Sequence, residues 1–133
     1  MPKPSEPPLP ALGELELAAL ERLWSAGEAD VSEVHAAIGR ARGISPNTVG
    51  SALERLHRKD LVRRRKVSYA YRYEPAMDRE TFHVRRMMQA VGGVRALADS
   101  GVLAAFVDAV AEVDAETLER LSALIEARRE GER

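Results

Sequence analysis

Apolar residues in the N-terminal part of the chain recur with the period of an α-helix. Leucines at helical spacing lead up to Trp24, and Gly27 is expected to end this first helix. Asp30 and Glu33 match a capping box, which predicts a second, short helix ending near Gly39. Two helices are therefore expected before residue 40.

The next helix has the clearest local signals. Ser45 is a favoured N-cap residue and Pro46 suits the first helical position, so a helix is expected to begin at Pro46 after a loop over residues 40–44. One face of this helix is apolar, with Val49, Ala52, Leu53 and Leu56. The opposite face is polar and basic, with Asn47, Thr48, Ser51, Arg55 and Arg58.

Beyond Asp60 the pattern changes from helical to alternating, which predicts two short strands that end at Pro75. The sequence here holds the basic run Arg63–Lys66, then three tyrosines. The order helix, helix, helix, hairpin, with no room for a large sheet, is that of a winged helix-turn-helix domain.

Helical spacing returns in residues 76–133. Asp78 is expected to cap a helix that the Gly92–Gly93 pair ends, apolar residues over 102–110 mark another helix, and Asp114 caps the last one. Such short helices make a poor independent core, so a second copy of the chain is the expected partner. The candidate dimer-interface residues are Phe82, Met88, Leu103, Phe106, Val107, Leu118, Leu121 and Ile125.

These patterns predict a mostly α-helical fold with a small β-hairpin. Residues 1–10 contain five of the seven prolines and are expected to form a disordered arm that the fold does not need. A winged-helix DNA-binding domain over 11–75 and a helical dimerisation domain over 76–133 would follow. Trp24 is expected to pack between the first and third helices.

Positive charge is concentrated in the middle of the chain. Residues 40–72 contain ten basic and two acidic residues, a net +8, whereas the whole chain carries −1. Residues 76–133 hold eight basic and eleven acidic residues, a net −3. A basic segment beside an amphipathic helix is typical of nucleic-acid binders, although a lone basic tetrapeptide is as often a solvated charge run.

Several function classes are disfavoured. The chain has no cysteine, which excludes disulfides, thiolate metal sites and cysteine nucleophiles. His35, His57 and His83 lack metal-ligand spacing, and no catalytic or phosphate-binding motif is present, so no enzyme activity, metal or cofactor is expected. There is no membrane-length apolar run or signal-peptide core, which favours a cytoplasmic protein without direct membrane binding.

Four segments resemble the penicillinase-repressor family, the BlaI/MecI type of regulator. They are LGELELAALERLW (12–24), DVSEVHAAI (30–38), TVGSALERLHRKDLV (48–62) and AYRYEP (70–75). The resemblance implies an N-terminal winged helix, a C-terminal helical dimerisation region, and repression by binding a palindromic double-stranded DNA operator.

The resemblance also assigns roles to residues. It implies that Asn47, Thr48 and Ser51 meet the bases, while Gly50 stands where relatives often carry a long side chain. The wing turn at residues 66–68 lacks the Gly or Asp that is common in relatives. The phosphate candidates are Arg42, Ser45, Arg55, Arg58, Arg63, Arg64, Arg65, Lys66 and Tyr69.

Some family members are inactivated when a membrane-bound sensor protease pathway cuts an Asn-Phe bond in the C-terminal region. The matching bond here is Ala105–Phe106, with Ala in place of Asn. The copper-responsive branch of the family carries a cysteine-rich motif, which this chain lacks.

Two other functions stay open from the sequence. The chain could be a winged-helix protein-interaction module whose basic wing docks an acidic protein, or a ligand-responsive regulator with a pocket between the C-terminal helices. A steep salt dependence and a palindromic footprint would distinguish DNA binding from the first of these.

Overall fold

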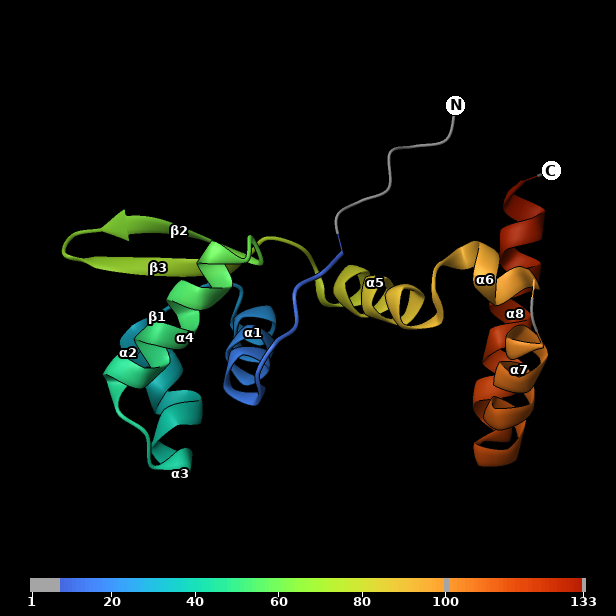
Figure 1. Cartoon of the computed structure of the whole chain (residues 1–133), viewed down its shortest axis with the longest axis horizontal. Helices are drawn as coiled ribbons and strands as arrows, with labels where there is room; N and C mark the ends of the chain where they lie inside the picture. Colours follow the sequence, from blue (N-terminus) through green and yellow to red (C-terminus); the bar gives the residue numbers. More distant parts are fainter. Residues whose placement is uncertain (1–7, 100, 133) are drawn as a thin grey trace. The chain divides into compact units, whose positions relative to one another are not determined.

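The computed structural model describes residues 8–99 and 101–132, and the chain forms two compact units that divide between Met87 and Met88. The first unit contains helices α1, α2, α3, α4 and most of α5, a π-helical turn η1, and a three-stranded antiparallel sheet (Figure 1). The second contains α6, α7 and α8. The predicted fold class, mostly helical with a small β-hairpin, is confirmed.

The elements of the first unit are α1 (Glu14–Ala26), β1 (Ala29–Asp30), α2 (Val31–Val34), η1 (His35–Gly39), α3 (Arg40–Arg42), α4 (Pro46–Arg58), β2 (Val62–Val67), β3 (Ala70–Pro75) and α5 (Arg79–Val91). Those of the second unit are α6 (Val94–Asp99), α7 (Val102–Val113) and α8 (Ala115–Gly131). The sequence pattern did not predict β1 or α6.

The capping box before α2 forms as predicted, but the helical segment that follows is longer. Asp30 accepts a hydrogen bond from the Glu33 N–H at 2.8 Å, and Glu33 accepts one from the Asp30 N–H at 3.1 Å. The chain then stays helical through η1 and α3 to Arg42, so the predicted loop over 40–44 is wrong for residues 40–42. The reason is that Gly43, with φ of 67°, takes the left-handed cap conformation, whereas Gly39 has φ of −82°.

Gly39 allows η1 to approach α4 closely. A Cβ at this position would lie 2.5 Å from Cδ2 of His35 and 3.1 Å from a methyl of Val49. The His35 ring is held in place because its Nε2 donates to the Ile44 carbonyl at 2.8 Å. A Cβ at Gly50, in contrast, would meet only Val31, at 3.7 Å.

Two glycine substitutions should therefore have opposite effects on stability. Gly39→Ala is expected to destabilise the first unit by about 1 to 3 kcal/mol through overpacking. Gly50→Ala should stabilise it by up to about 1 kcal/mol through helix propensity. Urea unfolding followed by the fluorescence of the single tryptophan measures both. Equal stabilities for the two variants would contradict the close approach.

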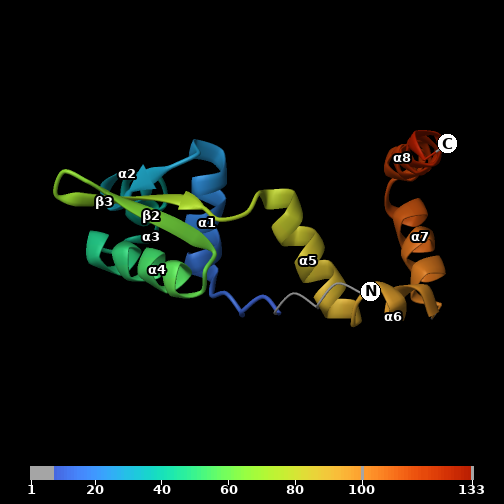
Figure 2. The ribbon, with the colours of Figure 1, turned by 90° about the horizontal axis from the view of Figure 1, so that it is seen from above.

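The sheet has the order β1-β3-β2, and β2 and β3 form the predicted hairpin, whose tip extends beyond the helices of its unit (Figure 2). In the register, Arg64 lies opposite Tyr73 and Lys66 lies opposite Tyr71. The turn falls at Ser68 and Tyr69, and Ser68 takes a φ of 60°, where a glycine would be favoured.

The core of the first unit is built from the apolar faces of α1 and α4, the sheet and Phe82 of α5. Trp24 was predicted to pack between the first and third helices, and the structure adds contacts with a later segment: its Nε1 donates to the Met77 carbonyl, just before α5, at 2.9 Å, and its ring lies 5.2 Å from that of Phe82 in α5. Phe82 is 1% exposed, so its predicted place in a dimer interface is wrong. This packing also carries the first unit beyond the predicted boundary at residue 75.

The predicted arm over residues 1–10 does not hold for Leu9. Residues 1–7 lie outside the described part of the chain, but the Leu9 side chain is 8% exposed and belongs to the core cluster. Burying a leucine releases about 1.5 to 3 kcal/mol, which is enough to fix this short segment against the helices.

The second unit exposes much of its apolar surface. Asp114 caps α8 as predicted, accepting from the Glu116 N–H at 3.1 Å. The helices α7 and α8 pack together, yet these large side chains stay more than a third exposed: Val102, Leu103, Phe106, Val107, Val113, Leu124 and Ile125. No helix in the described residues is long and apolar enough to span a membrane.

Candidate nucleic-acid interface

The polar face of α4 presents the predicted base-reading residues together. The Ser45 hydroxyl caps the helix, accepting from the Thr48 N–H at 3.2 Å, so the helix begins at Pro46 as predicted. Asn47, Thr48 and Ser51 are all exposed on its first turns. Because α4 packs its opposite face into the core, these short polar side chains point to solvent from a rigid helix.

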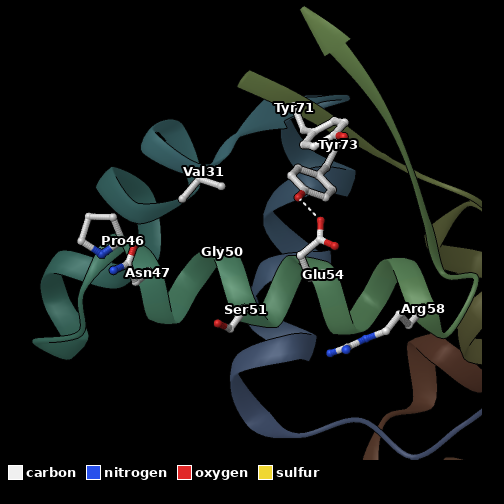
Figure 3. A pocket seen from close by; sticks show the side chains of 9 residues that line it. All are labelled: Val31, Pro46, Asn47, Gly50, Ser51, Glu54, Arg58, Tyr71 and Tyr73. Carbon is white, nitrogen blue, oxygen red and sulfur yellow. Dashed lines mark hydrogen bonds between the residues drawn. The ribbon is translucent and has the colours of Figure 1, made fainter. Parts of the chain in front are cut away.

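A groove of about 520 Å³ separates α4 from the sheet (Figure 3). It is lined by Val31, Pro46, Asn47, Gly50, Ser51, Glu54, Arg58, Tyr71 and Tyr73. Two of the three base-reading candidates thus share a concave surface with two tyrosines of the wing. Glu54 and Tyr73 were not among the predicted site residues, although the helical spacing of Glu54 from Ser51 (i+3) and Asn47 (i+7) indicates a shared face.

Strand alternation divides the basic run of the wing between two faces. Arg64 and Lys66 point to the same side of β2, and Arg63 and Arg65 point to the other. The first pair lies on the side of α4, since Tyr73, opposite Arg64, hydrogen-bonds to that helix. The four residues, predicted as equivalent phosphate candidates, therefore have different surroundings.

On the α4 side, Glu54 holds both strands of the wing. Its Oε1 accepts a hydrogen bond from the Tyr73 hydroxyl at 2.6 Å and forms an ion pair with Nη1 of Arg64. The Arg64 guanidinium also lies 4.4 Å from the centre of the Tyr71 ring, a cation–π distance. The hydrogen bond from Tyr73 and the ion pair with Arg64 lower the pKa of Glu54. Burial and the bond to Glu54 raise the pKa of Tyr73 to about 12.

The far face of the wing is occupied by ion pairs. Glu28 pairs with Arg65 at 3.0 Å and with Arg72 at 2.9 Å, and Arg72 also pairs with Glu33 at 2.8 Å. The hydrogen bonds from Arg65 and Arg72 lower the pKa of Glu28. This network fastens the outer side of the hairpin to β1 and α2.

A second group of cations is bound to α1. Glu16, only 6% exposed, pairs with Lys59 at 2.6 Å and with Arg55 at 3.6 Å. Burial opposes ionisation of Glu16, but the hydrogen bonds from Lys59 and the Gly13 N–H outweigh it and lower its pKa. Arg42 pairs with Glu14 at 2.7 Å.

These ion pairs neutralise part of the positive charge that was counted over residues 40–72. The predicted phosphate candidates that have an acidic partner are Arg42, Arg55, Arg63, Arg64 and Arg65. Their partners lie mostly outside the segment in which the charges were counted. Among the described residues, Arg58 and Lys66 are the charged candidates without an ion pair, and Tyr69 at the wing tip is 99% exposed. Of these two cations, Arg58 lines the groove, and Lys66 lies opposite Tyr71, which lines it as well.

The Tyr73 hydroxyl should make the stability of the first unit depend on alkaline pH. A folded-state pKa raised from 10.0 to about 12 contributes stability that is present below pH 10 and is lost as pH rises to 12. From pH 9 to 11 the wild type should lose about 1 kcal/mol more unfolding free energy than Tyr73→Phe. Urea titrations at both pH values test this; parallel losses in the two proteins would reject the buried hydrogen bond.

The helical segment of α2, η1 and α3, the turn at residues 43–45, the amphipathic helix α4 and the two-stranded wing define a winged helix-turn-helix, a class of nucleic-acid-binding domain. The penicillinase repressor family model matches residues 12–127, and the chain belongs to this family. It is 35% identical over 124 residues to the transcriptional regulator BlaI of Mycobacterium tuberculosis, covering 90% of this chain and 88% of that protein. The chain is thus a BlaI-like transcriptional regulator.

Two solved structures are similar to part of the chain. The solution structure of the DNA-binding domain of the repressor BlaI matches with a TM-score of 0.49 and 24% identity, over 53% of this chain and 87% of that one. The crystal structure of the AntR antimony-specific transcriptional repressor matches with a TM-score of 0.43 and 22% identity, over 53% and 60%. Within residues 8–99 and 101–132, no group of three or more acidic or histidine side chains is placed to hold a metal ion.

Proposed function

We propose that the chain is a homodimeric repressor that binds a palindromic operator, with α4 in the major groove and the β2–β3 wing against the backbone. The observation that supports this best is the exposed stripe formed by Asn47, Thr48 and Ser51 on a helix that is capped and packed on its other face. The major groove of B-DNA is about 12 Å wide and admits an α-helix. A cytoplasmic location follows from this target.

The side chains of the stripe suit base edges. An Asn can pair with adenine through two hydrogen bonds, while a Thr offers a hydroxyl to a base and a methyl to thymine. Arg58 and Lys66, without acidic partners among the described residues, would contact phosphates on either side of the groove. Phosphate contacts set the position, and the stripe supplies the sequence preference.

Two variants separate these roles. Thr48→Ala should weaken binding to the operator by about 1 to 3 kcal/mol with little effect on random DNA. Lys66→Ala should weaken binding to operator and random DNA alike. It should also lower the salt slope, the steepness with which log K falls with log salt concentration, by about one per protomer. Fluorescence anisotropy over a range of salt, on an operator selected from genomic fragments, measures each effect. Equal losses on operator and random DNA for both variants would reject the placement of α4 in the major groove.

A groove in the second unit favours a second candidate, a ligand-responsive regulator. It has a volume of about 340 Å³ and lies between α7 and α8, lined by Phe106, Ala109, Val110, Val113, Asp114 and Thr117. An apolar ligand bound there could change how the helices meet a partner copy. Thermal-shift screening of apolar compounds, with Val110→Trp to fill the groove, would test it. The protein-interaction alternative predicts neither a palindromic footprint nor a steep salt dependence.

A further inference from the structure

The groove-facing side of α4 carries one carboxylate among its neutral and basic side chains. Glu54 lines the groove together with Asn47, Ser51 and Arg58 (Figure 3). A negative charge on a surface that approaches phosphates opposes binding. Its presence therefore needs a compensating role in this regulator.

The contacts of Glu54 supply that role. One oxygen of its carboxylate receives the Tyr73 hydroxyl from β3 and the Arg64 guanidinium from β2, and Arg64 in turn lies over Tyr71. One side chain of α4 thus contacts both strands of the wing. The same ion pair neutralises the charge of Arg64, so this arginine is not available to DNA phosphates. Arg64 nevertheless lies on the same side of the wing as Lys66.

We propose that Glu54 is a positioning residue that determines specificity: it sets the wing against α4 and withholds Arg64 from phosphates, which suppresses sequence-independent binding. The proposal rests on the proposed function as a DNA-binding repressor. A free arginine on the wing would strengthen binding to any duplex by counterion release, whereas a wing held at one angle favours the operator alone.

Substitution of Glu54 should therefore raise affinity for the wrong DNA. In the full-length protein, Glu54→Gln is expected to steepen the salt slope on random duplex by about one per protomer. At 0.1 M salt this corresponds to roughly tenfold stronger random binding per protomer. The ratio of operator to random affinity should fall about tenfold or more, because the operator gains the same charge but loses the fixed wing. Adding Arg64→Gln to this variant should restore the wild-type slope on random DNA.

Glu28→Gln is the matched control. It makes the same change in net charge and also releases an arginine of the wing, Arg65, but on the face turned away from α4, where Arg72 keeps its ion pair with Glu33. Its salt slope on random DNA is expected to equal that of the wild type. A steeper slope in both variants would show that net charge alone sets the effect and would overturn the proposal.

A test that does not depend on the folding of the Glu54 variant compares Arg64→Gln with Lys66→Gln. Because Arg64 is ion-paired, Arg64→Gln should leave the salt slope on random DNA unchanged, whereas Lys66→Gln should lower this slope by about one per protomer. An equal decrease in both variants would place Arg64 on phosphates and overturn the proposal while leaving the repressor function intact. A wild type that binds duplex DNA without salt dependence would instead contradict the repressor function itself.

Discussion

Replacing Ile125 with Asp is expected to convert the protein from a dimer to a monomer at micromolar concentration. Ile125 is 47% exposed on α8, next to Leu124 at 56%, and Phe106 of α7 is 42% exposed. So much apolar surface on two helices favours burial against a second copy, since symmetric dimers are the commonest oligomers. In such a dimer the substitution would bury two unpaired carboxylates at a cost of about 2 kcal/mol or more each, which weakens association by about a thousandfold.

Because Ile125 is half exposed in the single chain, this substitution should leave the packing of α7 on α8 largely intact. Ala123→Asp is the matched control, as it places the same charge on the opposite face of α8. Sedimentation equilibrium should find Ala123→Asp dimeric and Ile125→Asp monomeric, with the same helix content by circular dichroism. A monomeric wild type, or an Ile125→Asp variant that dimerises like the wild type, would contradict the proposed interface.

Elements fixed by neighbouring residues could be predicted from the sequence. The structure confirms three predicted helix starts: Ser45 before Pro46, the capping box of Asp30 and Glu33, and Asp114. Gly27 ends α1 with a φ of 87°, also as predicted. Such signals act within one turn of helix, so a single sequence is enough to find them.

Features that depend on distant residues could not be predicted. Trp24 packs on Phe82 and Met77 of a segment that periodicity assigned to another domain, and Leu9 reaches the core from a proline-rich stretch. The strand β1 is only two residues long, and its pairing with β3 leaves no period in the sequence. Contacts between residues far apart in the sequence decide the positions of Trp24, Leu9 and β1.

The helix and the hairpin that carry the candidate interface were predicted, but the pairing of their charges was not. The alternation along β2 implied that Arg64 and Lys66 share a face, yet nothing in the sequence indicated that Glu54 would bind Arg64 and leave Lys66 free. The same holds for Glu28, which lies before the basic segment in the sequence but against its outer face in space. A charge count over a window therefore overstates the charge available to DNA.

A chain that ends at Ala105 is expected to keep a folded winged helix and bind the operator at least about tenfold more weakly. The buried core cluster runs from Leu9 to Phe82, so removing residues 106–133 takes away none of its members. The cut does remove α8 and two thirds of α7. The truncated chain should unfold in urea, followed by Trp24 fluorescence, with the same midpoint as the first unit of the full-length protein.

The loss of affinity comes from the loss of the dimer. A dimer holds two half-sites about 34 to 36 Å apart as one unit, with an effective concentration of about millimolar for the second half-site. A monomer must bind each half-site alone, although its α4 and wing are unchanged. Anisotropy on a single half-site should therefore give equal affinities for the truncated chain and the full-length protein, and only the full palindrome should distinguish them.

Whether this cut releases the repressor in the cell depends on helix opening. The Ala105–Phe106 bond lies inside α7, where the Ala105 N–H donates to the Gly101 carbonyl at 2.9 Å. Phe106 itself is 42% exposed in the single chain, so helical structure, rather than burial in the chain, would protect the bond. A protease needs an extended segment, so the rate of cleavage should follow the local opening of α7.

Gly substitution at Ala104 should speed cleavage, because it lowers helix propensity by about 1 kcal/mol. Mass spectrometry of the protein from induced cells decides the matter: full-length repressor beside an active promoter would mean release by a ligand or a modification.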